Sequence, residues 1–142
     1  PGDVFEGSDG TILVANKLGI KITKEDYECF LTILEAEAGD QGLKGLILVG
    51  NVIINRVKSP RYANDIQGVV FQKGQFSPVR PGGRYYTVTP DDLTREAVLQ
   101  VLSGTDYSEG AEYFCCKTSE DSMFNTRLKF LFKYRDHYFY KK

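Results

Sequence analysis

Residues 43–57 constrain the fold more than any other stretch of the chain. At helical spacing, their apolar side chains cover most of a helix surface: Leu43, Leu46, Ile47, Val49, Ile53, Ile54 and Val57. A helix that is apolar around most of its circumference must be covered by other elements on most sides. Polar Asn51, Asn55 and Arg56 interrupt the pattern, and Ser59-Pro60 ends it. We therefore predict a central helix on which the rest of the chain packs.

Two further helices are predicted on either side of this one in sequence. Thr23 is a typical N-cap, and apolar positions at helical spacing continue from it to Ala38. Thr89-Pro90 followed by two aspartates predicts another helix, with Thr89 as cap and Gly104 as its end. We expect residues 60–89, which are rich in Pro and Gly, to be a loop-rich insertion with short elements.

The C-terminal part of the chain has the pattern of strands. Residues 112–116 predict one strand, and residues 129–134 and 137–140 predict a hairpin with Arg135-Asp136 at its turn. Since Arg-Asp suits a two-residue turn poorly, we expect a longer loop there. Helices followed by a small antiparallel sheet give an α+β fold. We expect residues 1–22 to be a lead-in with one short strand and residues 23–142 to form the main domain.

Composition excludes several classes of function. The 142 residues carry a net charge of −1, which argues against nucleic acid as a partner. His137 is the only histidine, so imidazole zinc sites cannot be assembled, and we expect no metal and no cofactor. No apolar run reaches the roughly 18 residues of a membrane span. The chain begins at Pro1 without Met, and we expect an excised domain or a mature form.

The three cysteines do not suggest a disulfide framework. Cys29 stands alone, and Cys115 and Cys116 are adjacent. We expect them to be small buried hydrophobic residues, with one bridge between Cys29 and the pair left open as an alternative.

Glu37 is the residue that least fits its surroundings. It shares a helix face with Phe30, Ile33 and Leu34, whereas we expect Glu35, on another face, to be solvated. One interpretation is a carboxylate at a fraying helix end that simply reaches water. The other is a carboxyl in a half-apolar pocket, with a raised pKa, that acts as a general acid. The break at residues 39–42 would leave space beside it for a ligand.

Several blocks of the sequence together resemble the spore-cortex-lytic cell-wall hydrolase family (the SleB/CwlJ group). The most specific of them are Asn55-Arg56-Val57-Lys58-Ser59 and Gly74-Gln75-Phe76-Ser77-Pro78. The remaining matching blocks follow in order along residues 25–140: Leu34 to Ala38, Gly45, Thr89-Pro90, Arg95 to Ala97, Gly110-Ala111, Tyr113-Phe114, His137 and Phe139-Tyr140. The family often has Glu-Ala-Arg-Gly-Glu at the end of its catalytic helix and Gly-Gly before the histidine. This chain has Glu37-Ala38-Gly39-Asp40-Gln41 and Arg135-Asp136 instead.

The resemblance implies a lysozyme-like α+β domain that degrades peptidoglycan between N-acetylmuramic acid and N-acetylglucosamine. Glu37 would be the catalytic residue. We expect the candidate substrate-binding residues to be Gln75, Phe76, Ser77, Asn55, Tyr113 and His137. Asn55 has a structural role as its alternative, a buried amide that ties down a loop, and His137 could equally be a structural residue of a strand. Arg56 stays unassigned.

The absence of an obvious second carboxylate favours a lytic transglycosylase, since an ordinary glycosidase uses two. Hydrolysis with Asp40 placing a water is the close variant. The alternatives are a wall amidase or peptidase, whose thiol version needs Cys29 or Cys115 beside His137, and a non-catalytic peptidoglycan-binding module.

We expect a monomer with peptidoglycan glycan strands as its partner, no membrane insertion, and an extracytoplasmic location in the cell wall or spore cortex.

Overall fold

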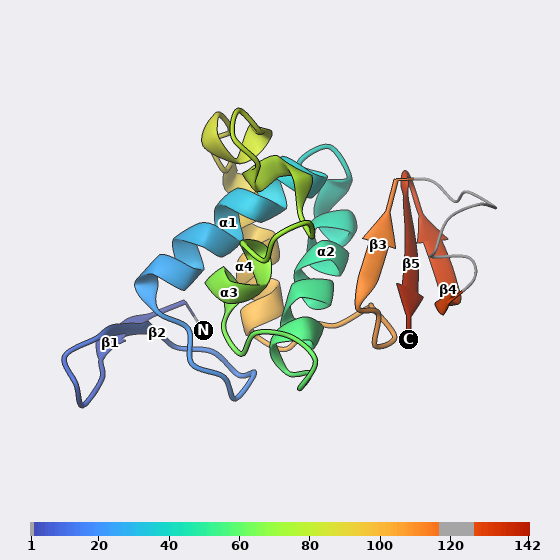
Figure 1. Cartoon of the computed structure of the whole chain (residues 1–142). Helices are drawn as coiled ribbons and strands as arrows, with labels where there is room; N and C mark the ends of the chain where they lie inside the picture. Colours follow the sequence, from blue (N-terminus) through green and yellow to red (C-terminus); the bar gives the residue numbers. More distant parts are fainter. Residues whose placement is uncertain (1, 117–126) are drawn as a thin grey trace.

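The computed structural model describes residues 2–116 and 127–142. It has a helical body with a small sheet at one end and a hairpin at the other (Figure 1). The elements follow one another as β1 (Val4–Glu6), β2 (Ile12–Val14), α1 (Lys24–Ala38), α2 (Gly42–Val57), α3 (Ile66–Val70), the 3-10 turns η1 (Ser77–Val79) and η2 (Arg84–Tyr86), α4 (Asp92–Leu102), β3 (Tyr113–Cys115), β4 (Lys129–Tyr134) and β5 (His137–Lys141). This is the α+β class that the sequence predicts. No helix of the described residues has the length and apolar character needed to cross a membrane.

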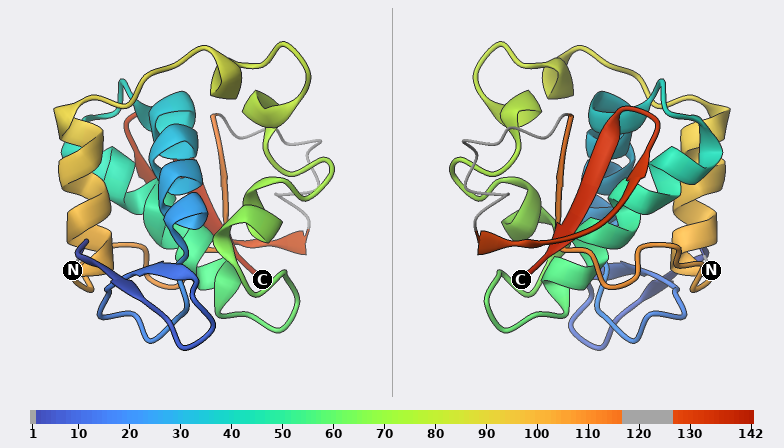
Figure 2. Two further views of the ribbon diagram at one scale, coloured as in Figure 1. Left: turned by 90° about the vertical axis from the view of Figure 1, so that its left-hand side faces the viewer. Right: turned by 90° about the vertical axis from the view of Figure 1, so that its right-hand side faces the viewer.

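Helix α2 is the centre of the molecule, as its apolar circumference predicts. It packs against α1, α3 and α4 on one side and against β3 on the other. In the right-hand view of Figure 2, the red C-terminal sheet lies in front of α2. In the left-hand view, the helices lie in front of the sheet. Leu48 and Val52 face the sheet and join Phe139 in a second small core. A Cβ on Gly50 would lie 3.1 Å from Val101, so α4 can approach α2 closely only because this residue is glycine.

The start of α1 is fixed by side-chain hydrogen bonds. Thr23 Oγ1 accepts from Asp26 N at 3.0 Å, and Asp26 Oδ2 accepts from Thr23 N at 3.1 Å, which is a capping box. Asp26 Oδ1 also accepts from Gln67 N at 3.1 Å, so the same carboxylate ties α3 to α1. The helix ends at Ala38, as predicted, and the short turn Gly39–Gln41 leads directly into α2.

The start of α4 differs from the prediction. Asp91, and not Thr89, is the N-cap, and its carboxylate accepts from Thr94 N at 2.9 Å. The prediction that Glu35 is free in solvent is also wrong. Glu35 Oε1 accepts from Asp91 N at 3.0 Å and from Thr94 Oγ1 at 2.8 Å. A contact between α1 and α4 therefore selects the cap, which a pattern within residues 89–92 cannot show.

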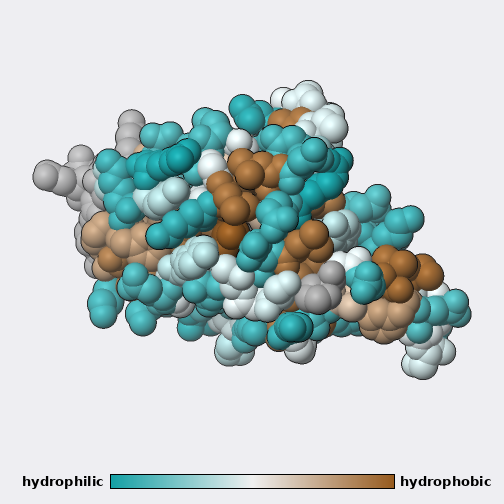
Figure 3. Space-filling view, turned by 180° about the vertical axis from the view of Figure 1, so that it is seen from behind, coloured by the Kyte–Doolittle hydropathy of each residue, from teal (hydrophilic) through white to brown (hydrophobic). Residues whose placement is uncertain are grey.

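The N-terminal segment forms a hairpin of two strands, where the sequence predicted one. Strand β1 pairs with β2 in antiparallel register from Val4↔Val14 to Glu6↔Ile12. The hairpin lies at the end of the molecule opposite to the sheet (Figure 1). Apolar side chains gather at that end of the surface (Figure 3), where Val4 and Phe5 are 64% and 51% exposed.

The C-terminal sheet has the strand order β3-β5-β4 and is antiparallel. Tyr134 pairs with His137, so the turn contains only Arg135 and Asp136, and the expected longer loop is wrong. Arg135 adopts a positive φ of 49°, which is uncommon for a residue other than glycine. Gln41 compensates for this, because its Oε1 accepts from Asp136 N at 3.1 Å and holds the turn against the start of α2.

Candidate active site

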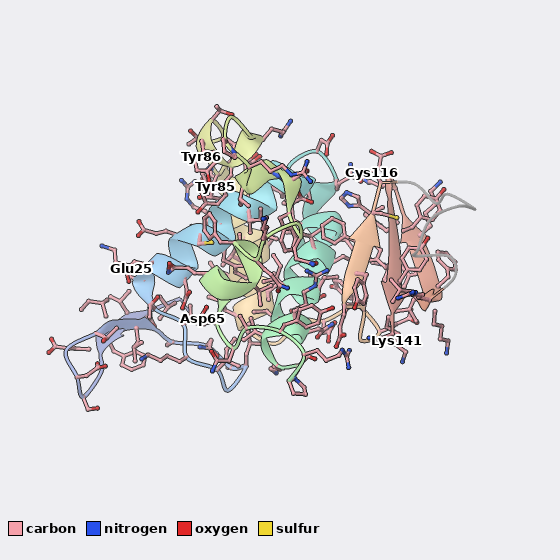
Figure 4. The ribbon with its side chains drawn as sticks, viewed as in Figure 1. Glu25, Asp65, Tyr85, Tyr86, Cys116 and Lys141 are labelled. Atoms are coloured by element: carbon pink, nitrogen blue, oxygen red, sulfur yellow. The ribbon has the colours of Figure 1, made fainter. Side chains whose placement is uncertain are left out.

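Glu37 lies in the last turn of α1, where two cavities meet. Glu37 lines both a groove of about 440 Å³ and a smaller cavity of about 210 Å³. Cys116 is the other residue that lines both of them. In Figure 4, Tyr85 and Tyr86 mark η2 on one side of the end of α1, and Cys116 marks the end of β3 on the other. The Glu37 carboxyl is therefore accessible to a ligand that occupies either cavity.

Burial raises the pKa of Glu37 from 4.5 to about 7, and the nearby positive charge of Arg84 opposes this rise. The cause is the loss of water around a carboxylate, which disfavours its charged form. At neutral pH the protonated and ionised forms are both well populated. The carboxyl can therefore give a proton to a ligand in the groove and take one back.

The groove is built from four parts of the chain. Helix α1 contributes Glu37, α2 contributes Arg56, and the remaining walls are the 74–80 loop and strand β3 with the following Cys116. Four of the residues predicted for substrate binding lie in this groove with Glu37, namely Gln75, Phe76, Ser77 and Tyr113. Phe76 is only 4% exposed and packs against Phe114 with 6.2 Å between the ring centroids, so it serves mainly as a wall. The roles of these residues in binding stay predictions.

Asn55 lies outside the groove. Its Nδ2 donates to Ser108 Oγ at 2.9 Å and to Ala111 O at 2.8 Å, which holds the segment that leads into β3. It lines a separate cavity next to α4. The structure thus places Asn55 in the loop-tethering role that the sequence left open, and does not bring it to Glu37.

His137 lines the smaller cavity beside Glu37 and not the groove itself. It is 4% exposed, and its ring meets Phe114 edge-to-face at 5.0 Å. Burial lowers the pKa of His137, with Asp136 and Asp40 acting in the opposite direction, so the imidazole is neutral at pH 7. Within residues 2–116 and 127–142, no group of three or more His, Cys, Asp or Glu side chains could hold a metal ion.

Arg56 is the residue of the site that the sequence left unassigned. It is 5% exposed, and its guanidinium lies 5.0–5.3 Å from the ring centroids of Tyr62, Phe76 and Tyr113. Its Nη1 donates to Gln75 Oε1 at 3.0 Å. Burial lowers its pKa, but an arginine stays charged at neutral pH. The sequence contained one signal for this role. An arginine on the most apolar helix of the chain is expected to be buried, and a buried arginine needs hydrogen-bond partners or aromatic rings around it.

Gln41 joins two carboxylates at the rim of the smaller cavity. Its Nε2 donates to Asp40 Oδ1 at 2.9 Å and to Asp136 Oδ2 at 2.8 Å. The hydrogen bond from Gln41 is the main reason why the pKa of Asp40 is lowered. Asp40 is therefore ionised at neutral pH, and it lies at the exposed edge of the cavity beside Glu37.

The three cysteines are free, so the bridge left open by the sequence does not form. Cys29 is buried as expected, and burial raises the pKa of its thiol to about 11, which disfavours a thiolate nucleophile. Cys116 is exposed at the edge of the groove, contrary to the expectation of a buried residue.

Comparisons with known proteins agree with one another. The family model for Cell Wall Hydrolase matches residues 40–140. The spore cortex-lytic enzyme of Halalkalibacterium halodurans is 31% identical over 109 residues, which cover 77% of this chain and 32% of that protein. The spore cortex-lytic enzyme of Bacillus subtilis is 33% identical over 92 residues, 65% of this chain and 30% of that protein. The chain thus spans about a third of the length of these relatives.

Two solved structures have the same fold. The catalytic domain of the germination-specific lytic transglycosylase SleB from Bacillus anthracis superposes with a TM-score of 0.73 at 27% identity, over 84% of this chain and 96% of that one. The catalytic domain of SleB from Bacillus cereus gives the same TM-score and identity, over 84% and 91%.

Proposed function

The chain belongs to the cell wall hydrolase family, and on that premise we propose that it is a lytic transglycosylase that cleaves the glycan strands of peptidoglycan, with Glu37 as its acid and base. The observation that carries the proposal is a single carboxyl with a pKa of about 7 at the meeting point of two cavities. We assign catalysis to residues 23–142, because every residue that lines the groove or the smaller cavity lies in this range.

In the first step, the Glu37 carboxyl gives its proton to the glycosidic oxygen between N-acetylmuramic acid and N-acetylglucosamine. The bond from this oxygen to C1 breaks, and the muramic ring acquires oxocarbenium character. In the second step, the 6-hydroxyl of the same muramic residue attacks C1, and the Glu37 carboxylate takes its proton. The product ends in 1,6-anhydro-muramic acid, and Glu37 is again protonated. A pKa near neutral pH suits both proton transfers.

The remaining carboxylates near the site favour this route over a two-carboxylate mechanism. Among the described residues that line the groove, Glu37 is the only acid. Asp40 and Asp136 lie on the rim of the other cavity, where both accept hydrogen bonds from Gln41. A retaining glycosidase needs a nucleophilic carboxylate roughly 5 Å from the acid. Internal attack by a hydroxyl removes this need, and a water placed by Asp40 remains the hydrolytic variant.

The setting of the reaction follows from the substrate. The relatives are named for lysis of the spore cortex, and we propose an extracytoplasmic site of action on peptidoglycan for this chain as well. Cortex and vegetative peptidoglycan differ in muramic lactam, so digestion of both preparations distinguishes the two substrates.

Digestion of purified peptidoglycan followed by mass spectrometry tests the proposal. We expect fragments that end in anhydro-muramic acid. Reducing muramic ends would instead indicate the hydrolytic variant, and freed peptides would overturn glycan cleavage in favour of an amidase or peptidase. Glu37→Gln should fold normally and lose activity by roughly 100- to 10,000-fold, the usual contribution of general acid–base catalysis. Retained activity in this variant would exclude Glu37 as the acid.

A further inference from the structure

The floor of the groove holds a buried arginine whose contacts fix the orientation of a neighbouring amide. Arg56 is enclosed by aromatic rings, and its Nε donates to Glu112 O at 2.7 Å. Its Nη1 donates to Gln75 Oε1 at 3.0 Å. Arg56 is 5% exposed, and these two hydrogen bonds together with the surrounding rings hold its Nη1 donor against Gln75.

This contact determines what Gln75 offers to a ligand. An arginine can only donate hydrogen bonds, so the side-chain oxygen of Gln75 must face Arg56 and the NH₂ group must face away. Gln75 is exposed and lines the groove. Its Nε2 has no hydrogen-bond partner among the described residues. The amide therefore turns its two N–H donors toward the groove, while its oxygen faces Arg56 and has one lone pair engaged there.

We propose that Arg56 and Gln75 form an acetamido-recognition site, in which Arg56 orients the Gln75 amide so that Nε2 donates to the carbonyl oxygen of an N-acetyl group of the glycan. This inference rests on the proposed function, which places a strand of N-acetylated sugars in the groove. Gln75 is the binding residue, and Arg56 is a positioning residue that acts through it.

The competing ligand group is a sugar hydroxyl, and chemistry separates the two. A hydroxyl both donates and accepts, so it can bind an amide or a carboxylate at position 75. The carbonyl oxygen of an N-acetyl group only accepts, so it can bind the amide but not a carboxylate. Removal of the acetyl group leaves an ammonium, which only donates and would prefer the carboxylate.

The decisive variant is therefore Gln75→Glu, with Gln72→Glu as its matched control. Gln72 is exposed on the same loop and does not line the groove, so the control adds the same charge outside the proposed site. Its contact with the site is a backbone hydrogen bond, Gln75 N to Gln72 O, which the substitution keeps. Each protein is assayed for glycan cleavage on purified peptidoglycan, on the same material after chemical de-N-acetylation, and after re-acetylation.

On N-acetylated peptidoglycan, we expect Gln75→Glu to raise KM roughly tenfold with little change in kcat, because a carbonyl then faces a carboxylate. On de-N-acetylated peptidoglycan, the same variant should have a higher kcat/KM than the wild type. After re-acetylation, the wild type should again have the higher kcat/KM. A preference for N-acetylated substrate equal to that of wild type and Gln72→Glu would overturn the inference.

Arg56→Gln tests the positioning role. A glutamine side chain there can accept as well as donate, so Gln75 is free to turn its oxygen toward the groove. The ratio of kcat/KM between the acetylated and de-N-acetylated substrates should then fall several-fold. An equal loss on both substrates would mean that Arg56 is only structural.

The failure of the proposed function and the failure of this inference give different results. If the wild type and Gln72→Glu release no glycan fragments from any preparation, the proposed function fails and the inference falls with it. If both cleave the glycan but the variants show no change in substrate preference, the inference alone is refuted.

Discussion

Replacement of Glu37 by glutamine should stabilise the protein above neutral pH, because the folded structure holds this carboxyl where its charged form is disfavoured. Burial raises the pKa of Glu37 from 4.5 to about 7. Each pKa unit corresponds to about 1.4 kcal/mol. Ionisation of Glu37 in the folded state therefore costs about 3 kcal/mol of folding free energy relative to the unfolded chain.

The direction of the pH dependence follows from proton binding. Between the two pKa values the folded protein binds more protons than the unfolded chain, so stability falls as pH rises through this window and then levels off. Below pH 4.5 the carboxyl is protonated in both states, and Glu37→Gln and wild type should unfold at similar temperatures. At pH 8 the variant should be more stable by about 3 kcal/mol, which is roughly a 10 °C rise in Tm for a domain of this size.

Thermal and urea unfolding at pH 4 and pH 8 measure this difference. Glu28→Gln is the control, since Glu28 is an exposed carboxylate on the same helix and its replacement removes the same charge. If the difference in stability between Glu37→Gln and wild type is the same at both pH values, the burial of Glu37 does not disfavour its charged form, and the physical basis of the proposed acid is wrong.

The remaining predictions concern pH, the rim and the core. Activity should fall above about pH 7, where Glu37 loses the proton that it must donate. Arg84→Gln removes the charge that lowers the pKa of Glu37, so the basic limb of a kcat/KM profile should move to higher pH; an unmoved limb would mean that Arg84 has no influence on the acid. Gln41→Ala should lower the free energy of unfolding by roughly 1–3 kcal/mol, because it removes the hydrogen bonds that hold Asp136 and the β4–β5 turn, and urea unfolding measures this loss. Gly50→Ala should cost roughly 1–3 kcal/mol by overpacking α2 against α4, and an unchanged urea midpoint would show that the helices can separate.

The helical framework could be predicted from the sequence because its signals are local. The apolar circumference of residues 43–57, the capping of α1 by Thr23 and the end of α1 at Ala38 each depend on side chains within one or two turns. Glu37 was identified in the same way, as a carboxyl on an apolar helix face. The predictions that failed depend on contacts between distant segments. The local pattern predicts Thr89 as the cap of α4. The structure has Asp91 there instead, because Glu35 on another helix accepts from Asp91 N, and this contact is not visible in the local sequence.

The same difference between local signals and contacts of distant segments applies to the candidate active site. The sequence by itself determined that a carboxyl sits at the end of a half-buried helix and that a loop-rich segment follows the central helix, since residue type and periodicity decide both. Only the tertiary structure decided which side chains surround that carboxyl. It brought Gln75 and Tyr113 into the groove, left Asn55 outside, and placed the buried Arg56 beneath Gln75. The physical reason is that a pKa and a hydrogen-bond orientation depend on atoms a few ångströms away in space, and the packing of helices and sheet, not spacing along the chain, determines which atoms those are.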